Sequence, residues 1–398
     1  MKKLIAISVM IALIAGAAFA DTSMSGNVEA RLNLFMGEFG DHGEAYDGGY
    51  PKPVTQGSIA SGQFKLSGAS DDGSMGGAFR FRYHYVADES FRWSQAFIWW
   101  KPFDQIRIWM GVDDDGMFET GQLTSWAFHQ GTESYLVVHN WDFWRNIFPG
   151  LWDTFGVALS FYLVPGLDLN LVIPIGQSSG WPRHHNGAVT RAMKIEEMYP
   201  GCLQLSGGFA IPDVGKILFA WMGSETSWFD EDNAKFGKIG ASFYSGSIVD
   251  GLQFQLGAST NISKSADDGG ADEPISVGAA VHYGAGDFGV KFRIGSDIQT
   301  KEEGGMFLTF NIMPTYNVAG IGKICFDFGM SMNKADNDAD MENGFWINPY
   351  LKAPLSGGYF QIGLMVLSNI GGGQGGSHSV VVDDKPRVYL PMVMGFNF

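Results

Sequence analysis

Apolar and polar side chains alternate with a period of two over most of the chain, which is the pattern of β-strands. Residues 79–85 are the clearest case, because aromatic rings at the odd positions alternate with Arg80, Arg82 and His84. Segments of this kind predict eighteen strands, near residues 25–36, 58–68, 76–86, 91–101, 105–112, 153–164, 167–175, 203–211, 215–222, 236–245, 252–262, 275–283, 288–296, 306–317, 323–332, 345–353, 358–367 and 387–398. The fold class is therefore all-β.

Two kinds of β-protein alternate in this way, the soluble sandwich and the membrane barrel. Several predicted strands reach ten residues, which suits a tilted crossing of a bilayer. Short turns such as Pro165-Gly166 and Pro212-Asp213 alternate with long polar connections, as they do in outer-membrane barrels. We therefore expect an antiparallel, transmembrane up-and-down β-barrel of eighteen strands. Sixteen strands remain open, because the alternation is weakest in 58–68, 91–101 and 345–353.

The first twenty residues have the features of a cleaved Sec signal peptide. Lys2 and Lys3 precede an apolar run, and Ala18-Phe19-Ala20 offers a cleavage site. The run is shorter than the ~20 residues of a membrane-spanning helix. We expect residues 1–20 to be removed and residues 21–398 to form a single barrel domain. Loss of the two lysines changes the net charge from −16 to −18.

The chain ends in alternating apolar residues, with Phe396 two positions before the terminal Phe398. This ending resembles the C-terminal strand of bacterial outer-membrane proteins, which the barrel-assembly machinery is understood to recognise. Together with the signal segment and the alternation, it makes the chain similar to bacterial porin-type β-barrels. The glycine-rich, acidic style also resembles outer-membrane proteins of spirochaetes such as treponemes. The resemblance implies a barrel in the lipid of the bacterial outer membrane.

Basic side chains fall on one face of the predicted strands. A basic residue at the lipid midplane would cost ~2–4 kcal/mol, so this face is expected to line a watery lumen. Lys291 and Arg293 lie on it in a later strand. The inward basic residues of the first five strands are Arg31, Lys65, Arg80, Arg82, Arg92 and Arg107. Because neighbouring strands lie ~4.8 Å apart, these six are expected to form one positive stripe.

The longest predicted connection, residues 113–152, follows the stripe directly and carries Asp113, Asp114, Asp115 and Glu119. It is the third extracellular loop by our count. The position resembles that of the general-porin loop that folds into the barrel and sets acidic residues across from a basic wall. Such a constriction would orient polar solutes and bias ion selectivity. The alternative is that the basic residues form internal salt bridges that brace a plugged barrel.

These features predict a channel for the passive diffusion of ions and small polar solutes. One alternative is a surface adhesin or ligand-binding barrel whose connections 113–152, 176–202 and 368–386 bind partners. Another is a substrate-specific transporter for sugars or hydrophobic solutes. Aromatic rings near the strand ends indicate belts at the membrane–water interface. They are Trp93, Trp99, Trp100, Trp109, Phe155, Phe161, Tyr162 and Phe396. Trp109, however, has the lumen parity and could stack on sugars.

Other chemistry has little support in the sequence. The acidic excess argues against nucleic acid as a partner, because phosphate binding needs clustered basic residues. Cys202 and Cys325 are too few for a thiolate metal site, and the strand map places them too far apart for a disulfide. We expect no cofactor, no metal, no catalytic residues and no enzymatic activity. A homo-oligomer, the solute and the charge selectivity are left open.

Overall fold

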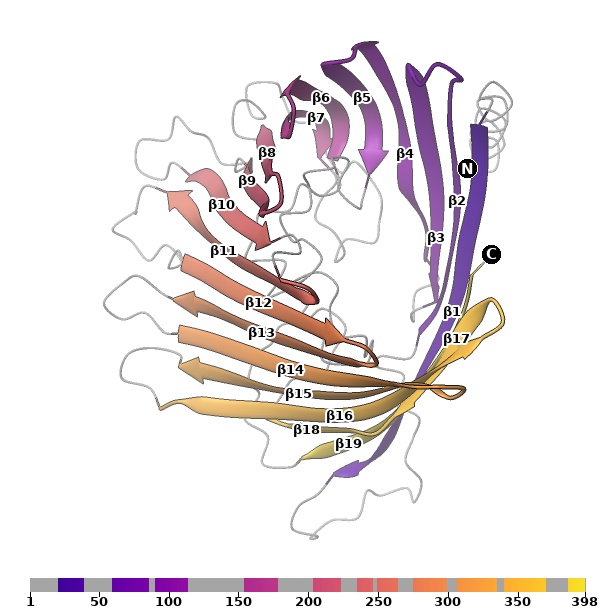
Figure 1. Cartoon of the computed structure of the whole chain (residues 1–398), viewed down its shortest axis with the longest axis vertical. Helices are drawn as coiled ribbons and strands as arrows, with labels where there is room; N and C mark the ends of the chain where they lie inside the picture. The colour runs from indigo at the N-terminus through magenta and orange to yellow at the C-terminus, as the bar shows by residue number, and fades with distance from the viewer. Residues whose placement is uncertain are drawn as a thin grey trace.

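The computed structural model describes residues 21–38, 59–85, 90–113, 154–177, 203–222, 235–245, 249–263, 275–298, 306–334, 340–369 and 386–397. Every regular element in these ranges is a β-strand (Figure 1). The first half contains β1 (Asp21–Glu38), β2 (Ile59–Ala69), β3 (Met75–Tyr85), β4 (Ser90–Phe103), β5 (Ile106–Asp113), β6 (Thr154–Val164), β7 (Leu167–Gln177), β8 (Gln204–Ile211) and β9 (Gly215–Met222). The second half contains β10 (Lys235–Ser245), β11 (Leu252–Ser263), β12 (Ile275–Ala285), β13 (Phe288–Ile298), β14 (Met306–Val318), β15 (Gly322–Lys334), β16 (Glu342–Leu355), β17 (Gly358–Gly363), β18 (Met365–Ser368) and β19 (Arg387–Asn397).

The strands form one closed antiparallel sheet. Apart from β17 and β18, each strand pairs with the next along the chain, and β1 also pairs with β19, which closes the barrel. β17 and β18 both lie between β16 and β19, so they are two halves of one crossing. The barrel therefore has eighteen strands, as predicted. The three segments in which the apolar–polar alternation is weakest are present as β2, β4 and β16. The first strand begins at Asp21, four residues earlier than expected.

Prolines explain why β17 and β18 are separate. Pro349 of β16 and Pro391 of β19 flank the interruption at Leu364, and neither has the N–H that a sheet ladder needs. Leu364 still donates its N–H to the carbonyl oxygen of Pro349 at 3.0 Å. On its other side Pro391 lies opposite Asn33 of β1. The sheet thus accommodates Pro391 by a local break in hydrogen bonding and without loss of register.

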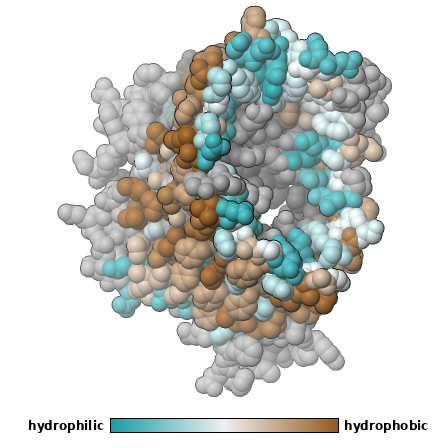
Figure 2. Space-filling view, viewed as in Figure 1, coloured by the Kyte–Doolittle hydropathy of each residue, from teal (hydrophilic) through white to brown (hydrophobic). Residues whose placement is uncertain are grey.

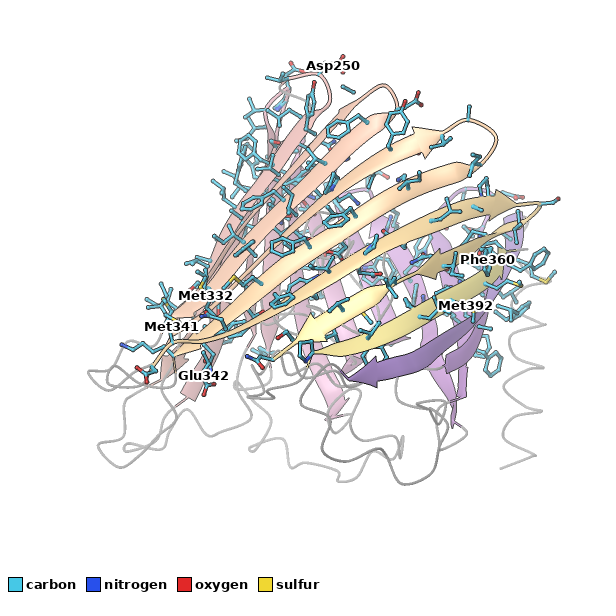
Figure 3. The ribbon with its side chains drawn as sticks, turned by 90° about the horizontal axis from the view of Figure 1, so that it is seen from below. Asp250, Met332, Met341, Glu342, Phe360 and Met392 are labelled. Atoms are coloured by element: carbon cyan, nitrogen blue, oxygen red, sulfur yellow. The ribbon has the colours of Figure 1, made fainter. Side chains whose placement is uncertain are left out.

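The connections are short at one end of the barrel. Residues 165–166 join β6 to β7, and residues 212–214 join β8 to β9. These turns need left-handed backbone, which Gly166 (φ 82°) and Asp213 (φ 61°) provide. Figure 3 shows Asp250, between β10 and β11, at this short-turn end, and Glu342, which begins β16, at the other. The third connection at the other end, from β5 to β6, is the longest in the chain.

The two faces of the sheet differ in polarity. Exposed large apolar residues such as Phe64, Leu256 and Phe292 have the outward parity, whereas Ser206 and Asn311 on the inward parity are buried. Figure 2 shows hydrophobic residues gathered on the outer side of the wall and hydrophilic residues toward the middle of the molecule. Exposed apolar surface of this extent suits contact with lipid or with another protein. Among the described residues, no helix is both long enough and apolar enough to cross a membrane.

Asp72 organises the turn between β2 and β3. Its Oδ1 accepts hydrogen bonds from the Ser70 hydroxyl at 2.6 Å and from the Ser74 N–H at 2.9 Å. These bonds, with that from Ser70 the largest, lower the pKa of Asp72 from 3.8 to about 2. Because the pKa of Asp72 is lower in the folded protein than in the unfolded chain, these hydrogen bonds stabilise the fold fully at any pH above the unfolded-state pKa. This stabilisation is lost as the pH falls through about 2.

We expect Asp72→Asn to lower the urea midpoint of unfolding at neutral pH, because the amide is a weaker acceptor than the carboxylate. The difference from the parent should shrink as the pH falls through about 2, where Asp72 itself takes up a proton. Folded and unfolded barrels can be separated by gel mobility in a urea series. Asp71→Asn removes an equal charge from the same turn and serves as the control. A difference that is the same at pH 7 and at pH 2 would contradict the assignment.

Candidate functional site

The inner face of the first five strands brings four of the predicted basic residues together. Lys65 lies directly opposite Arg80, and Arg82 lies directly opposite Arg92. A bulge in β4 at Ser94 keeps the second pair in phase with the first. Like charges that face each other across strands are destabilising. The register nevertheless places these four positions next to one another on β2, β3 and β4, and the Arg80 side chain is only 6% exposed.

The register separates the other two basic residues from this cluster. Arg31 lies opposite Ile59, which is six residues along β2 from Lys65, or about 20 Å. Arg107 lies opposite Ser160, six residues along β5 from Asp113. The structure thus forms a compact cluster of four residues with two outlying ones, and it differs from the single stripe that parity suggested.

The first acidic residue of the long connection lies in the same row as the basic cluster. Asp113 ends β5 opposite Gln95, which is itself opposite Arg80. Two strand spacings, about 10 Å, separate the backbones of Asp113 and Arg80. Five other residues singled out in the sequence lie outside the described residues: Asp114, Asp115, Glu119, Cys202 and Phe398. Most of the three connections proposed for partner binding also lies outside them.

Arg107 is held in an aromatic cluster on the inner wall. Its Cζ lies 4.8 Å from the ring centre of Trp99, 5.1 Å from that of Trp109 and 5.7 Å from that of Tyr162. Cation–π attraction favours this placement. Trp109 is buried and donates its Nε1–H to the Ser160 hydroxyl at 2.9 Å, which fixes its ring.

This cluster changes the interpretation of the aromatic residues. Trp99 and Tyr162 face the interior together with Trp109, so they do not belong to an interfacial belt. Trp100 and Phe396 have the outward parity and are 49% and 51% exposed, as a belt residue would be. The difference arises because neighbouring positions in a strand point to opposite faces.

A second buried cluster lies on β13 to β16. Arg293, 2% exposed, donates from Nε and Nη2 to Asn311 Oδ1 at 3.2 and 2.6 Å. Asn311 Nδ2 donates to Asp327 Oδ1, and Trp346 Nε1 donates to the same oxygen at 3.2 Å. The Trp346 ring lies over Gly329, where any larger side chain would collide with it. Arg293 also interacts electrostatically with Asp327.

This network gives Arg293 a different setting from its neighbour on the strand. Lys291 is only partly buried, whereas Arg293 is enclosed and hydrogen-bonded within the wall. Cys325 lies close by, buried and packed with Met313 and Tyr350. Neither Asn311 nor Asp327 was among the predicted site residues, although their inward parity would have marked them.

The fold of the chain is similar to those of solved outer-membrane proteins. OmpF of Salmonella typhi, in complex with daunomycin, has a TM-score of 0.51 and 12% identity over 95% of this chain and 97% of that chain. The anion-selective porin from Comamonas acidovorans has a TM-score of 0.50 and 12% identity, covering 95% and 99%. OccAB4 of Acinetobacter baumannii has a TM-score of 0.55 and 7% identity, covering 96% and 98%.

The chain has a porin-type barrel fold. No protein-family model matches it, and no curated protein sequence matches it. At such low identity the likeness concerns the path of the backbone. The porin-type barrel therefore tells us where the inner-wall residues lie. The chemical properties of that wall must be inferred from the side chains of this chain.

Proposed function

We propose that this porin-type barrel is an outer-membrane channel for the passive diffusion of ions and small polar solutes. A closed barrel with an apolar, exposed outer face and a polar inner face supports this function. An interior bounded by eighteen strands is too wide for side chains alone to fill. Export through a cleaved signal, residues 1–20, is part of the proposal, and β1 begins directly after the predicted cleavage site.

The basic cluster of Lys65, Arg80, Arg82 and Arg92 is the observation that carries the proposal. The register places the four positions side by side, and four cations there would create a local positive potential that concentrates anions and repels cations. Asp113, with Asp114, Asp115 and Glu119 beyond it, would supply the opposite pole of a transverse field. Lys291 on β13 would add positive charge to a different part of the wall.

Planar lipid bilayers provide the direct test. Purified, folded protein is expected to produce discrete ion-conducting steps, and liposomes that contain it should swell in small uncharged solutes. Protein unfolded by heat before addition is the control for detergent effects. Folded protein that gives neither conductance nor swelling would overturn the channel.

Assembly and partners complete the proposal. Phe396 is exposed on the outer surface near the end of β19. The barrel-assembly machinery would recognise this residue and the terminal Phe398. The outer face would contact outer-membrane lipid or a second copy of the chain in a homo-oligomer.

A further inference from the structure

A cavity of about 570 Å³ lies at the short-turn end of the barrel, beside the turns that follow β4, β6 and β8. Gln105, Tyr162, Asp168 and Lys216 provide its polar lining, and Leu163 and Pro165 are among the apolar residues. Backbone hydrogen bonds link neighbouring turns at its edge: the Tyr162 N–H donates to Gln105 at 2.8 Å, and the Ala210 N–H donates to Gly166 at 2.7 Å. These bonds hold the turns beside the cavity in place.

An ion pair crosses one wall of this cavity. Lys216 Nζ of β9 lies 3.4 Å from Asp168 Oδ2 of β7, and the two side chains meet over Gly208 of the intervening strand β8. A Cβ at position 208 would collide with Lys216 Cε and would lie 3.0 Å from Asp168 Oδ1. Gly208 leaves open the space in which the two side chains meet. Both charged groups keep some exposure, 33% for Lys216 and 14% for Asp168.

The lining has the chemistry of a site for an uncharged polyol. The positive charge of its one ammonium and the negative charge of its one carboxylate cancel. A charged ligand would therefore gain little electrostatic attraction over a neutral one. Lys216 donates hydrogen bonds, Asp168 accepts them, and the Gln105 amide does both. Adjacent hydroxyls on a sugar ring need such a mixed set within a few ångströms. The Tyr162 ring and Pro165, which both line the cavity, offer apolar surface to the C–H face of the sugar.

We propose that this cavity is a binding subsite for neutral sugars at the short-turn mouth of the barrel. Its volume lies in the range of small-molecule sites, roughly 300–1,000 Å³. The inference rests on the proposed channel function, because the site would take up solutes that enter or leave the lumen. Tyr162 also contacts Arg107, so the site adjoins the aromatic cluster on the inner wall.

Isothermal titration calorimetry of the folded protein in detergent, with maltotriose as the neutral sugar, tests the proposal. The parent is expected to bind saturably. Gly208→Val, which fills the space under the ion pair, and Lys216→Met, which removes the donor, should each weaken binding at least tenfold. Asp168→Asn keeps the size of the side chain and should weaken it too. Lys352→Met is the matched control, because Lys352 contacts the Tyr359 ring at 4.5 Å outside the cavity. Its binding should equal that of the parent.

Binding in detergent does not depend on ion conduction, so the two proposals fail separately. Protein that conducts ions but gives no heat with maltotriose overturns the sugar site and leaves the channel intact. Protein that binds maltotriose but never conducts overturns the channel alone. Two further results overturn the sugar site: unchanged affinity in both Gly208→Val and Lys216→Met, or heat with the zwitterion glycine in place of the sugar. Gel mobility shows that each variant is folded.

Discussion

Replacement of Asp327 by alanine is expected to lower the free energy of unfolding of the barrel by about 3–5 kcal/mol. Asp327 is 1% exposed and accepts hydrogen bonds from Asn311 and Trp346. Its removal leaves the buried Arg293 without the negative charge that compensates it. A buried guanidinium stays protonated, so the loss cannot be relieved by neutralisation.

Urea unfolding followed by Trp fluorescence and gel mobility measures this effect. Ser331→Ala is a matched control on the same strand and face, because Ser331 is buried and donates one neutral hydrogen bond to Thr309 at 3.1 Å. Its loss should cost only about 1 kcal/mol. The double variant Asp327→Leu with Arg293→Met removes both charges and should recover much of the stability. If Asp327→Ala costs no more than Ser331→Ala, the network does not stabilise the barrel.

Neutralising Arg80 and Arg82 with glutamine is expected to shift the ion selectivity of the channel toward cations. A unit charge acts on an ion about 7 Å away in water with roughly 0.6 kcal/mol, which is about a threefold change in local ion concentration per charge. Two charges removed from the cluster should therefore change the permeability ratio several-fold. Reversal potentials in a salt gradient measure the ratio directly, and the shift should shrink at high salt.

Lys334→Met is the control for this measurement, because Lys334 ends β15 on the outward parity, away from the lumen. Its selectivity should match that of the parent. Arg80 is largely buried, so the competing interpretation is that internal pairs hold it in the wall. In that case the double variant would lose stability while its reversal potential stayed unchanged, and the basic cluster would have no part in selectivity.

The alternation of apolar and polar residues predicted most of the architecture. It located all eighteen crossings, including β2, β4 and β16, where it is weakest. It also assigned Arg80, Asp327 and Trp109 to the inward face, because side chains in a strand alternate strictly between two faces. The alternation did not predict the break between β17 and β18, because that break comes from two prolines on neighbouring strands.

Which inward residues meet was decided only by the tertiary structure. Register, bulges and barrel tilt placed Arg92 opposite Arg82 and put Arg107 among Trp99, Trp109 and Tyr162. They also brought Asp168 and Lys216 together over Gly208, across a strand that separates them. The sequence by itself determined the strands and the face of each side chain, because those depend on neighbours along one strand. The contacts on the inner wall depend on how strands slide past one another, and that is fixed only when the whole barrel closes.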